Sequence, residues 1–220
     1  MSGTKKRILA ASRLMFNKHG YDQVTIRMIA LKVNMSSGNL NYHYKKREDI
    51  LEAIYFEMHD GFNKNGSDTI EGKTSILLIK HEIQMGMNRM LDYKFFWTDL
   101  YNILKVSSKV RDHFQEFHLK QREDCFKMFT RLMNQGLMMR PSFRMEHDFL
   151  AELMISFGNN WLYSTQLKET INFKESSEEK VEILLTILYP YLTFQGKNEF
   201  QLLFPTSFEQ ERPSASVNYL

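Results

Sequence analysis

Two short helical patterns separated by a tight turn occupy residues 25–47, TIRMIALKVNMSSGNLNYHYKKR, and this stretch constrains the fold more than any other. Thr25 is a favourable N-cap for the first pattern, which runs to about residue 33. The turn that follows contains Asn34, which tolerates the left-handed conformation that ends a helix, and Ser36, which can cap the next helix. The apolar residues of the first pattern recur on one helical face: Ile26, Ile29, Ala30 and Val33. The spacing predicts a helix-turn-helix.

The second helix of this pair, at about residues 37–44, has little to bury. Leu40 is the residue that we expect to pack inward. The other residues are small, polar or aromatic: Ser37, Gly38, Asn39, Asn41, Tyr42 and His43. Hydrogen bonding to base edges and phosphates in a major groove is one reason for a protein to hold out such a helix. The composition therefore favours a helix that lies on DNA.

A longer pattern surrounds this pair of helices, with the segment ILAASRLMFNKHGYDQVT before the turn motif and KKRE after it. Across residues 8–51 the chain resembles the DNA-binding domain of the TetR/AcrR family of bacterial transcriptional regulators, without gaps in the spacing. Two positions depart from the family pattern: Asn34 replaces the usual turn glycine, and Asn41 replaces an aromatic residue that contacts phosphate. The matching residues are Ile8, Leu9, Ala11, Phe16, Gly20, Tyr21, Thr25, Arg27, Ile29, Ala30, Ser36, Gly38, Leu40, Tyr42, His43, Tyr44, Lys45, Arg47, Glu48 and Leu51.

The resemblance implies an all-α protein with two parts. We expect an N-terminal three-helix helix-turn-helix DNA-binding domain at residues 1–47, followed by a linking helix at residues 46–62 through which any ligand-driven change must pass. The polar, glycine-bearing stretch NKNGSDTIEGK then marks a domain boundary. Residues 63–195 are expected to form a helical effector-binding and dimerisation domain, and residues 196–220 a C-terminal tail.

The same resemblance assigns candidate DNA contacts by position. Base contacts supply the choice of sequence, and phosphate contacts supply affinity that falls with salt. The candidates for base contact are Arg27, Ser37, Gly38 and Asn39. The candidates for phosphate contact are Thr25, Asn41, Tyr42, His43, Lys45 and Arg47.

Charge is distributed unevenly along the chain, in a way that agrees with a DNA-binding head. Residues 1–50 hold ten Lys or Arg against three Asp or Glu, a net charge of +7, whereas the remaining 170 residues carry a net charge of −4. A basic head on a mildly acidic body is what a polyanion-binding module with a separate sensing domain would show, although small basic segments are also common.

Cysteine usage and hydropathy indicate a cytoplasmic location. Cys125 is the only cysteine, so no intrachain disulfide can form, and a reducing compartment is expected. The longest apolar run, at residues 183–192, is far shorter than the ~20 residues that cross a bilayer. We therefore expect a soluble cytoplasmic protein without a membrane partner.

The body beyond residue 63 has a helical period in every segment and sustained strand alternation in none, which predicts an all-α fold. Nine of the fourteen methionines lie between Met85 and Met154, among many aromatic residues. This combination suits a pocket for a small hydrophobic ligand, although the same residues could simply form core. The candidate pocket residues are Phe96, Trp97, Tyr101, Phe117, Met128, Phe129 and Trp161.

A Gly158-Asn159-Asn160 triplet interrupts an otherwise apolar helical segment at residues 146–167. A glycine there costs roughly 1 kcal/mol of helix stability relative to alanine, which close helix approach could offset. In the family the last two helices pair with their symmetry mates, so we expect the helices at 146–167 and 178–194 to form a homodimer contact. The candidate interface residues are Phe157, Gly158, Asn160, Leu184 and Leu188.

Catalysis is the competing class of function, and the sequence offers little for it. Neither HExxH nor GxSxG occurs, and no phosphate-cradling glycine loop or Cys/His metal cluster is present. We therefore expect no catalytic residue, no metal and no cofactor. The sequence predicts a homodimeric, ligand-responsive transcriptional repressor on a palindromic operator. The alternative is a helical ligand-binding or scaffold protein that has lost DNA binding.

Overall fold

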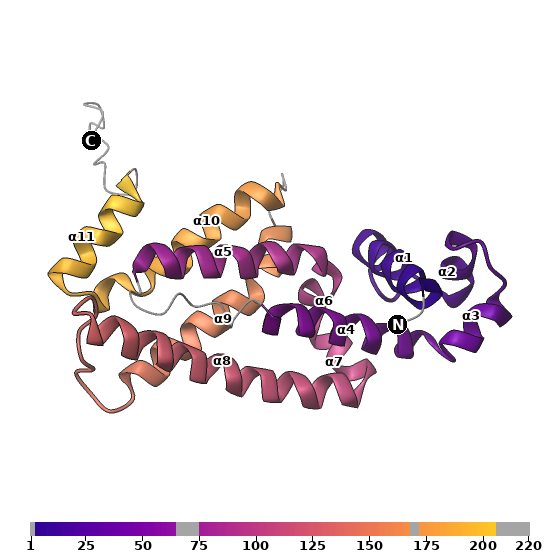
Figure 1. Ribbon diagram of the computed structural model, residues 1–220, viewed down its shortest axis with the longest axis horizontal. Helices are drawn as coiled ribbons and strands as arrows, with labels where there is room; N and C mark the ends of the chain where they lie inside the picture. Colours follow the sequence, from indigo (N-terminus) through magenta and orange to yellow (C-terminus); the bar gives the residue numbers. More distant parts are fainter. Residues whose placement is uncertain (1–2, 65–74, 168–171, 206–220) are drawn as a thin grey trace, which may run out of the picture.

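A small helical head and a larger helical body lie end to end in the computed structural model, which describes residues 3–64, 75–167 and 172–205 (Figure 1). In these ranges every regular element is a helix, and the one β-bridge is isolated, between Met138 and Leu192. The elements are α1 (Gly3–His19), α2 (Ile26–Lys32), α3 (Ser37–His43), α4 (Arg47–Lys64), α5 (Ile76–Asp92), α6 (Lys94–Thr98), α7 (Leu100–Val106), α8 (Ser108–Asn134), α9 (Glu146–Gln166), α10 (Phe173–Thr186), the 3-10 helix η1 (Tyr189–Tyr191) and α11 (Phe194–Leu203). The prediction of an all-α protein is confirmed.

The head consists of α1, α2 and α3, in which α2 packs on both α1 and α3, and α1 also packs on α4. The expected caps form: the Thr25 hydroxyl accepts from the Met28 amide at 3.3 Å, and the Ser36 hydroxyl accepts from the Asn39 amide at 3.2 Å. Asn34 has φ of 53°, the left-handed conformation predicted for the turn. The buried core of the head contains Ile8, Leu9, Phe16, Tyr21, Val24, Ile29, Ala30, Val33, Leu40, Tyr44, Ile50 and Leu51.

The linking helix α4 leaves the head and runs along the body, where it packs against α8. Tyr55 of α4 and His113 of α8 share a hydrogen bond of 2.8 Å, and the Ser107 hydroxyl, which also caps α8, donates to the Glu52 carboxylate at 2.7 Å. The helix ends at Lys64, so most of the expected break at 63–73 lies outside the described residues.

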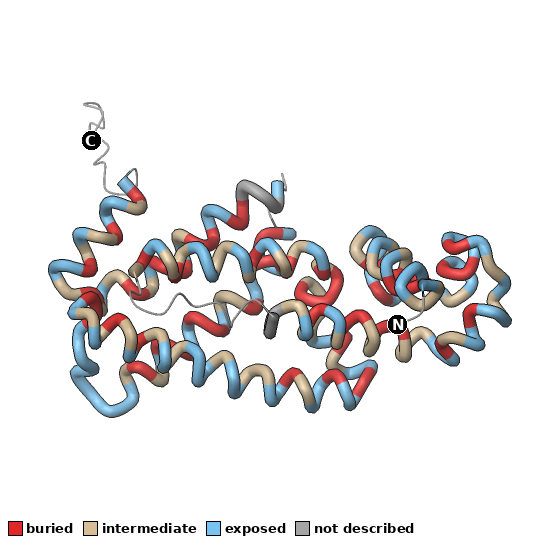
Figure 2. The backbone as a smooth tube through the Cα atoms, in the orientation of Figure 1, coloured by how far each residue is buried: buried red, intermediate tan, exposed pale blue. Residues whose placement is uncertain are grey.

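In the body α9 is central, since it packs against α6, α8 and α10, while α10 packs on α5. Buried positions recur along one side of each long helix of the body, as Figure 2 shows. No helix among the described residues is long and apolar enough to cross a bilayer.

The body also contains two short helices, and a further helix lies in the expected tail. The segment after α5 forms α6 and α7, which are separated by a break at Asp99. Helix α10 begins at Phe173. The tail expected at residues 196–220 begins inside a further helix, α11, which Thr193 caps by accepting from the Gly196 amide at 3.2 Å. The rest of the expected tail, from residue 206, lies outside the described residues.

Candidate nucleic-acid interface

The helix α3 presents nearly all of its side chains to solvent. Leu40 is its one fully buried residue, whereas Tyr42 is 85% exposed. Gly38, Asn39 and Asn41 are also exposed. The single inward residue holds the helix on the core while its other faces remain open, which is the arrangement that a groove-binding helix requires.

The residues predicted to contact bases lie at the start of α3 and on the adjacent α2. Ser37, Gly38 and Asn39 form the first turn of α3, and in helix-turn-helix proteins this end of the recognition helix contacts base edges. Ser37 is half-buried, and Arg27 on α2 is exposed. A Cβ added at Gly38 would meet only the Ser36 hydroxyl, at 4.0 Å, so internal packing does not require this glycine. The four side chains are therefore available, and their DNA contacts remain a prediction.

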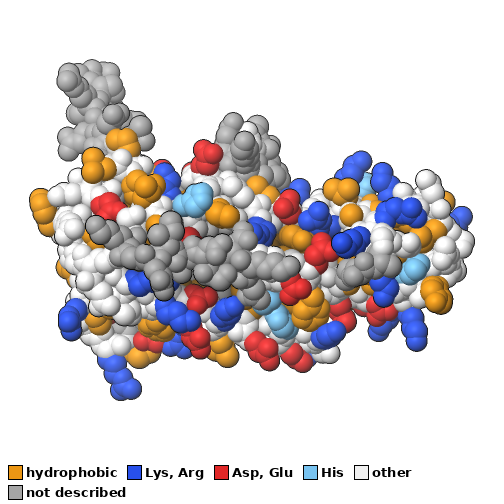
Figure 3. Space-filling view, viewed as in Figure 1, with side chains coloured by type: hydrophobic (Ala, Val, Ile, Leu, Met, Phe, Trp, Pro, Cys, Tyr) orange, Lys and Arg blue, Asp and Glu red, His pale blue; other side chains and the backbone are white. Residues whose placement is uncertain are grey.

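Most residues predicted to contact phosphate are also accessible. Asn41, Tyr42 and Lys45 are exposed, and His43 is half-buried with its ring edge-on to Tyr42, 5.4 Å between centroids. Thr25 is exposed, but its hydroxyl already serves as the N-cap of α2. Figure 3 shows Lys and Arg side chains gathered over the end of the molecule that α1 to α3 form. This end can attract a polyanion.

Arg47 has a structural role that its sequence position did not indicate. Its Nη1 donates to the backbone carbonyls of Tyr21, Asp22 and Val24 at 3.1, 3.1 and 3.0 Å. Its guanidinium also lies 4.0 Å from the centroid of the Tyr21 ring. Burial raises the pKa of Tyr21 to about 12, against the opposing effect of the Arg47 charge. The guanidinium therefore fastens the loop between α1 and α2 to α4, and the phosphate contact expected for Arg47 stays a prediction.

Six of the seven candidate pocket residues, all but Tyr101, lie in one continuous hydrophobic core or pack against it. Phe96 and Trp97 are buried near the head and contact each other and Phe114. Phe129 lies against His147. Trp161 is buried and donates from Nε1 to the Met90 sulfur at 3.3 Å, while Phe117 and Met128 are half-buried.

Tyr101 corrects the pocket prediction. Its side chain is 70% exposed, with the Lys105 ammonium 3.9 Å from its ring centroid. The short helix α7 buries Ile103 instead, so Tyr101 points away from the interior.

Three candidate dimer residues also need correction. Leu184 lies on α10, which packs on α5 and α9, and Leu188 follows that helix. The two side chains are 6% and 2% exposed within a single chain. Gly158 is half-buried and shares a helical face with buried Met154 and Leu162, four residues away on either side, so it lies on the inner side of α9.

The outer face of α9 carries the exposed residues. Phe157 is half-buried, and Asn160 is exposed, with its amide donating to the Ser156 carbonyl at 2.9 Å. The exposed large apolar residues of this helix and its C-cap are Phe149, Leu153, Tyr163 and Leu167. The sequence prediction for a dimer contact includes this helix but not these four exposed residues.

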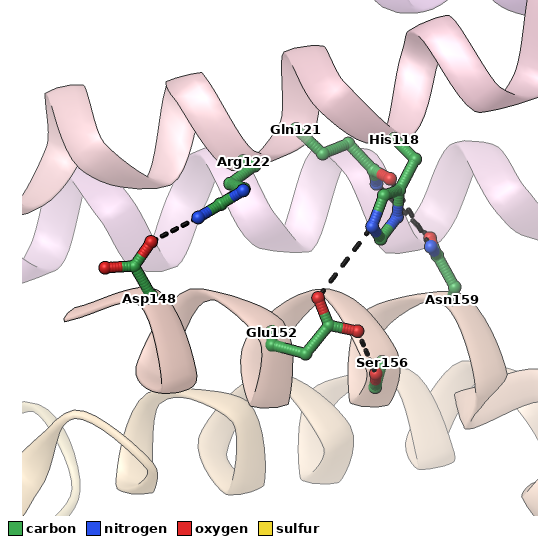
Figure 4. Close-up of polar contacts among 7 residues, drawn as sticks. All are labelled: His118, Gln121, Arg122, Asp148, Glu152, Ser156 and Asn159. Carbon is green, nitrogen blue, oxygen red and sulfur yellow. Dashed lines mark hydrogen bonds and ion pairs between the residues drawn. The ribbon is translucent and has the colours of Figure 1, made fainter. Parts of the chain in front are cut away.

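A ladder of polar contacts joins α8 to α9, as Figure 4 shows. The Gln121 and Asn159 amides exchange two hydrogen bonds, at 3.2 and 3.3 Å. Arg122 pairs with Asp148 beside them. The amide of Asn159 is therefore used between two helices of the same chain. Among the described residues no group of three potential metal ligands lies together.

The fold and the exposed α3 define a helix-turn-helix DNA-binding protein with a helical body. Two family models match the chain: the one described as "Bacterial regulatory proteins, tetR family" at residues 8–54, and the one described as "Bacterial transcriptional repressor", named TetR, at residues 58–200. The chain belongs to the TetR family of bacterial transcriptional regulators.

Individual relatives are distant in sequence. The chain is 28% identical over 119 residues to the uncharacterized HTH-type transcriptional regulator YerO of Bacillus subtilis (strain 168); the match covers 52% of this chain and 41% of that protein, less than half its length. Its fold is similar to that of a TetR-family transcriptional regulator from Marinobacter aquaeolei VT8, with a TM-score of 0.83, 21% identity and coverage of 92% and 97% of the two chains. The SmeT–triclosan complex also has a similar fold, with a TM-score of 0.61, 14% identity and coverage of 88% and 93%.

Proposed function

We propose that this protein is a homodimeric transcriptional repressor whose operator binding is controlled by a small, largely hydrophobic ligand. The observation that carries the proposal is α3, a helix that buries only Leu40 and holds its polar residues out from a basic head. Each head would insert α3 in a major groove, with its first turn at the base edges. The protein would act in the cytoplasm, where its operator DNA lies.

Two-fold symmetry would give a palindromic operator, with half-sites one helical turn or a multiple apart. The supporting surface for a dimer is the outer apolar stripe of α9, formed by Phe149, Leu153, Tyr163 and Leu167. These residues recur at helical spacing on one side of α9, while the other side packs on α6, α8 and α10. The stripe consists of two apolar pairs, Phe149 with Leu153 and Tyr163 with Leu167, and exposed Ser156 and Asn160 lie between them. Exposed apolar residues gathered on one face mark interaction surfaces. A second copy of the same stripe is the occupant that symmetry favours.

The middle of α8 is where we place the ligand. Phe114 and Phe129, toward the two ends of its inner face, are buried, whereas Phe117, Gln121 and Met128 between them are only half-buried. Across from them, no atom outside the local helix lies within 4 Å of a Cβ built at Gly158, on the inner side of α9. Open space on α9, opposite a half-buried stretch of α8 that carries Phe117 and Met128, suits a small apolar molecule. SmeT, whose fold is similar, forms a complex with triclosan.

Gel shifts on the upstream region of the protein's own gene test DNA binding. Tyr42→Ala removes an exposed aromatic from α3, and Tyr101→Ala is a matched control, since both tyrosines are largely exposed. We expect Tyr42→Ala to weaken binding by about tenfold, the equivalent of roughly one phosphate contact of ~1.4 kcal/mol, and the control to bind as the wild type does. Equal binding by both variants would contradict the proposed role of α3.

Native mass spectrometry of the purified protein tests the ligand. We expect a co-purified apolar molecule, and we expect Gly158→Leu to exclude it because the added side chain would occupy the open space. Leu119→Met, a substitution at an exposed position on the outer side of α8, is the control. Retention of the same molecule by Gly158→Leu would place the ligand elsewhere.

A further inference from the structure

The side-chain amide of Asn17, on α1 of the head, makes two hydrogen bonds to the backbone of the body. Its Nδ2 donates to the Asp92 carbonyl at 2.8 Å, and its Oδ1 accepts from the Phe95 amide at 3.0 Å. The partners are 75 and 78 residues away in sequence. One side chain of the DNA-binding head is thus hydrogen-bonded both to the end of α5 and to the start of α6.

No side chain within the corner between α5 and α6 caps the start of α6. Tyr93 is both the C-cap of α5 and the N-cap of α6, and its side chain makes no capping hydrogen bond to α6. Helix ends leave carbonyls at the C-terminus and amides at the N-terminus without partners inside the helix. Asn17 satisfies one of each: the terminal carbonyl of α5, and an amide in the first turn of α6, as an N-cap side chain would.

Two neighbouring residues of α1 join the same contact. The Phe16 ring lies 5.2 Å from the Phe95 ring, and the Arg13 guanidinium lies 4.9 Å from the centroid of Tyr93. Residues 13, 16 and 17 share one face of a helix because they are three and four positions apart. The hydrogen bonds of Asn17 therefore lie within a packed, oriented contact between α1 and the body, at the end of the body nearest the head (Figure 1).

The short helix α6 also reaches the interior of the body. Phe95 faces the head, but the next residue, Phe96, lies 5.3 Å from Tyr55 of α4 and 5.9 Å from Phe114 of α8. Trp97 is buried 6.2 Å from Phe114. A shift of these interior residues would move the backbone to which Asn17 is bonded.

We propose that Asn17 is a positioning residue, which fixes the orientation of the DNA-binding head on the body and gives the head a second connection beside the covalent one through α4. This inference rests on the proposed dimeric function, because in a dimer the orientation of each head sets the distance between the two recognition helices. A head held only by α4 would tolerate more than one distance between half-sites.

The test measures binding to DNA duplexes that carry two copies of the half-site found by selection from a random-sequence pool. The spacer between the two copies is varied one base pair at a time. We expect the wild type to favour one spacer. In Asn17→Ala, the preference for that spacer over its neighbours should fall by about tenfold, the size of an ordinary coupling between two sites. The sequence preference within each half-site should not change. Asn134→Ala, at an exposed position near the far end of α8, is the matched control and should keep the wild-type spacer.

Asn17→Asp is the second variant. Its carboxylate can accept from the Phe95 amide but has no hydrogen for the Asp92 carbonyl, so it should also loosen the spacer preference. If Asn17→Ala fails to fold, Asn17→Asp takes its place as the test of the positioning role. A sharp wild-type preference that the folded Asn17 variant retains overturns the positioning role alone. A wild type that binds half-sites without any spacer preference overturns the dimeric function and the positioning role together.

Discussion

Replacing Arg47 separates two roles for one side chain, a clamp within the head and a contact to DNA phosphate. The structure shows Nη1 donating to the carbonyls of Tyr21, Asp22 and Val24, with the guanidinium over the Tyr21 ring. A phosphate contact would need only the positive charge, whereas the clamp needs the planar fork of arginine. Arg47→Ala removes both features, and Arg47→Lys keeps the charge.

The magnitude follows from the geometry. One nitrogen has two hydrogens, so the three short contacts amount to about two full hydrogen bonds from a charged donor, each worth roughly 1.5 to 3 kcal/mol. The ring contact adds about 0.5 to 1 kcal/mol. Because Arg47 is only half-buried, water recovers part of this, and we expect Arg47→Ala to destabilise the head by about 2 to 4 kcal/mol. Arg47→Lys should recover less than half of the loss.

Native-state hydrogen exchange of the full-length protein measures this loss, because it reports the free energy of local opening. The Val24 amide, which donates to the Tyr21 carbonyl at 3.3 Å, lies in the fastened loop and should exchange faster in both variants. Lys45→Ala is the control: Lys45 is exposed, so its loss should flatten the salt dependence of DNA binding by about one unit without changing exchange. Wild-type exchange in Arg47→Ala, together with a flattened salt slope, would refute the clamp.

Three further predictions test other parts of the molecule. Asn39→Ala should relax the choice of base at one position of the operator by ~1–3 kcal/mol, and an unchanged selection profile would remove Asn39 from the base-contacting set. Leu153→Glu should raise the dissociation constant of the dimer by about a hundredfold, because an unpaired buried carboxylate costs ~3 kcal/mol. Sedimentation measures this constant, and Leu119→Glu is the control that should leave it unchanged. A dimer unaffected by Leu153→Glu would exclude the α9 stripe as the interface. Burial lowers the pKa of His59 from its ordinary value of 6.5. The charges of His113 and Lys120 lower this pKa further, and the Asp60 carboxylate opposes them. The unfolded chain should therefore take up the proton first as pH falls below 6.5, so the free energy of unfolding should decrease there; His59→Gln should flatten this decrease, and an equally steep decrease in the variant would contradict it.

Local rules predicted the head well because each element there carries its own signal. Thr25 and Ser36 cap the helices that they precede, Asn34 adopts the left-handed turn, and Leu40 is the buried residue of α3. Hydrogen bonds to neighbours three residues away and a single φ angle depend little on the rest of the chain. The resemblance carried by residues 8–51 agrees with the match of the family model over residues 8–54.

The body was harder to predict because its contacts join residues that are distant in sequence. A hydrophobic period identifies a helix but not which neighbour each side meets. The period therefore predicts Leu184 at a dimer contact, whereas it packs inside its own chain, and Tyr101 in a pocket, whereas it is exposed. The amide of Asn17 and the guanidinium of Arg47 look like ordinary surface groups until the fold brings their backbone partners to them. No short-range sequence pattern predicts either contact.

Selection of bound duplexes from a random-sequence pool at low salt tests most directly whether α3 reads DNA as half of a symmetric pair. The account predicts that the wild type enriches a palindrome with two half-sites one helical turn or a multiple apart, and that Asn39→Ala changes the enriched bases in both halves symmetrically. Recovery of an unenriched pool by the wild type, or of a site without two-fold symmetry, would contradict it.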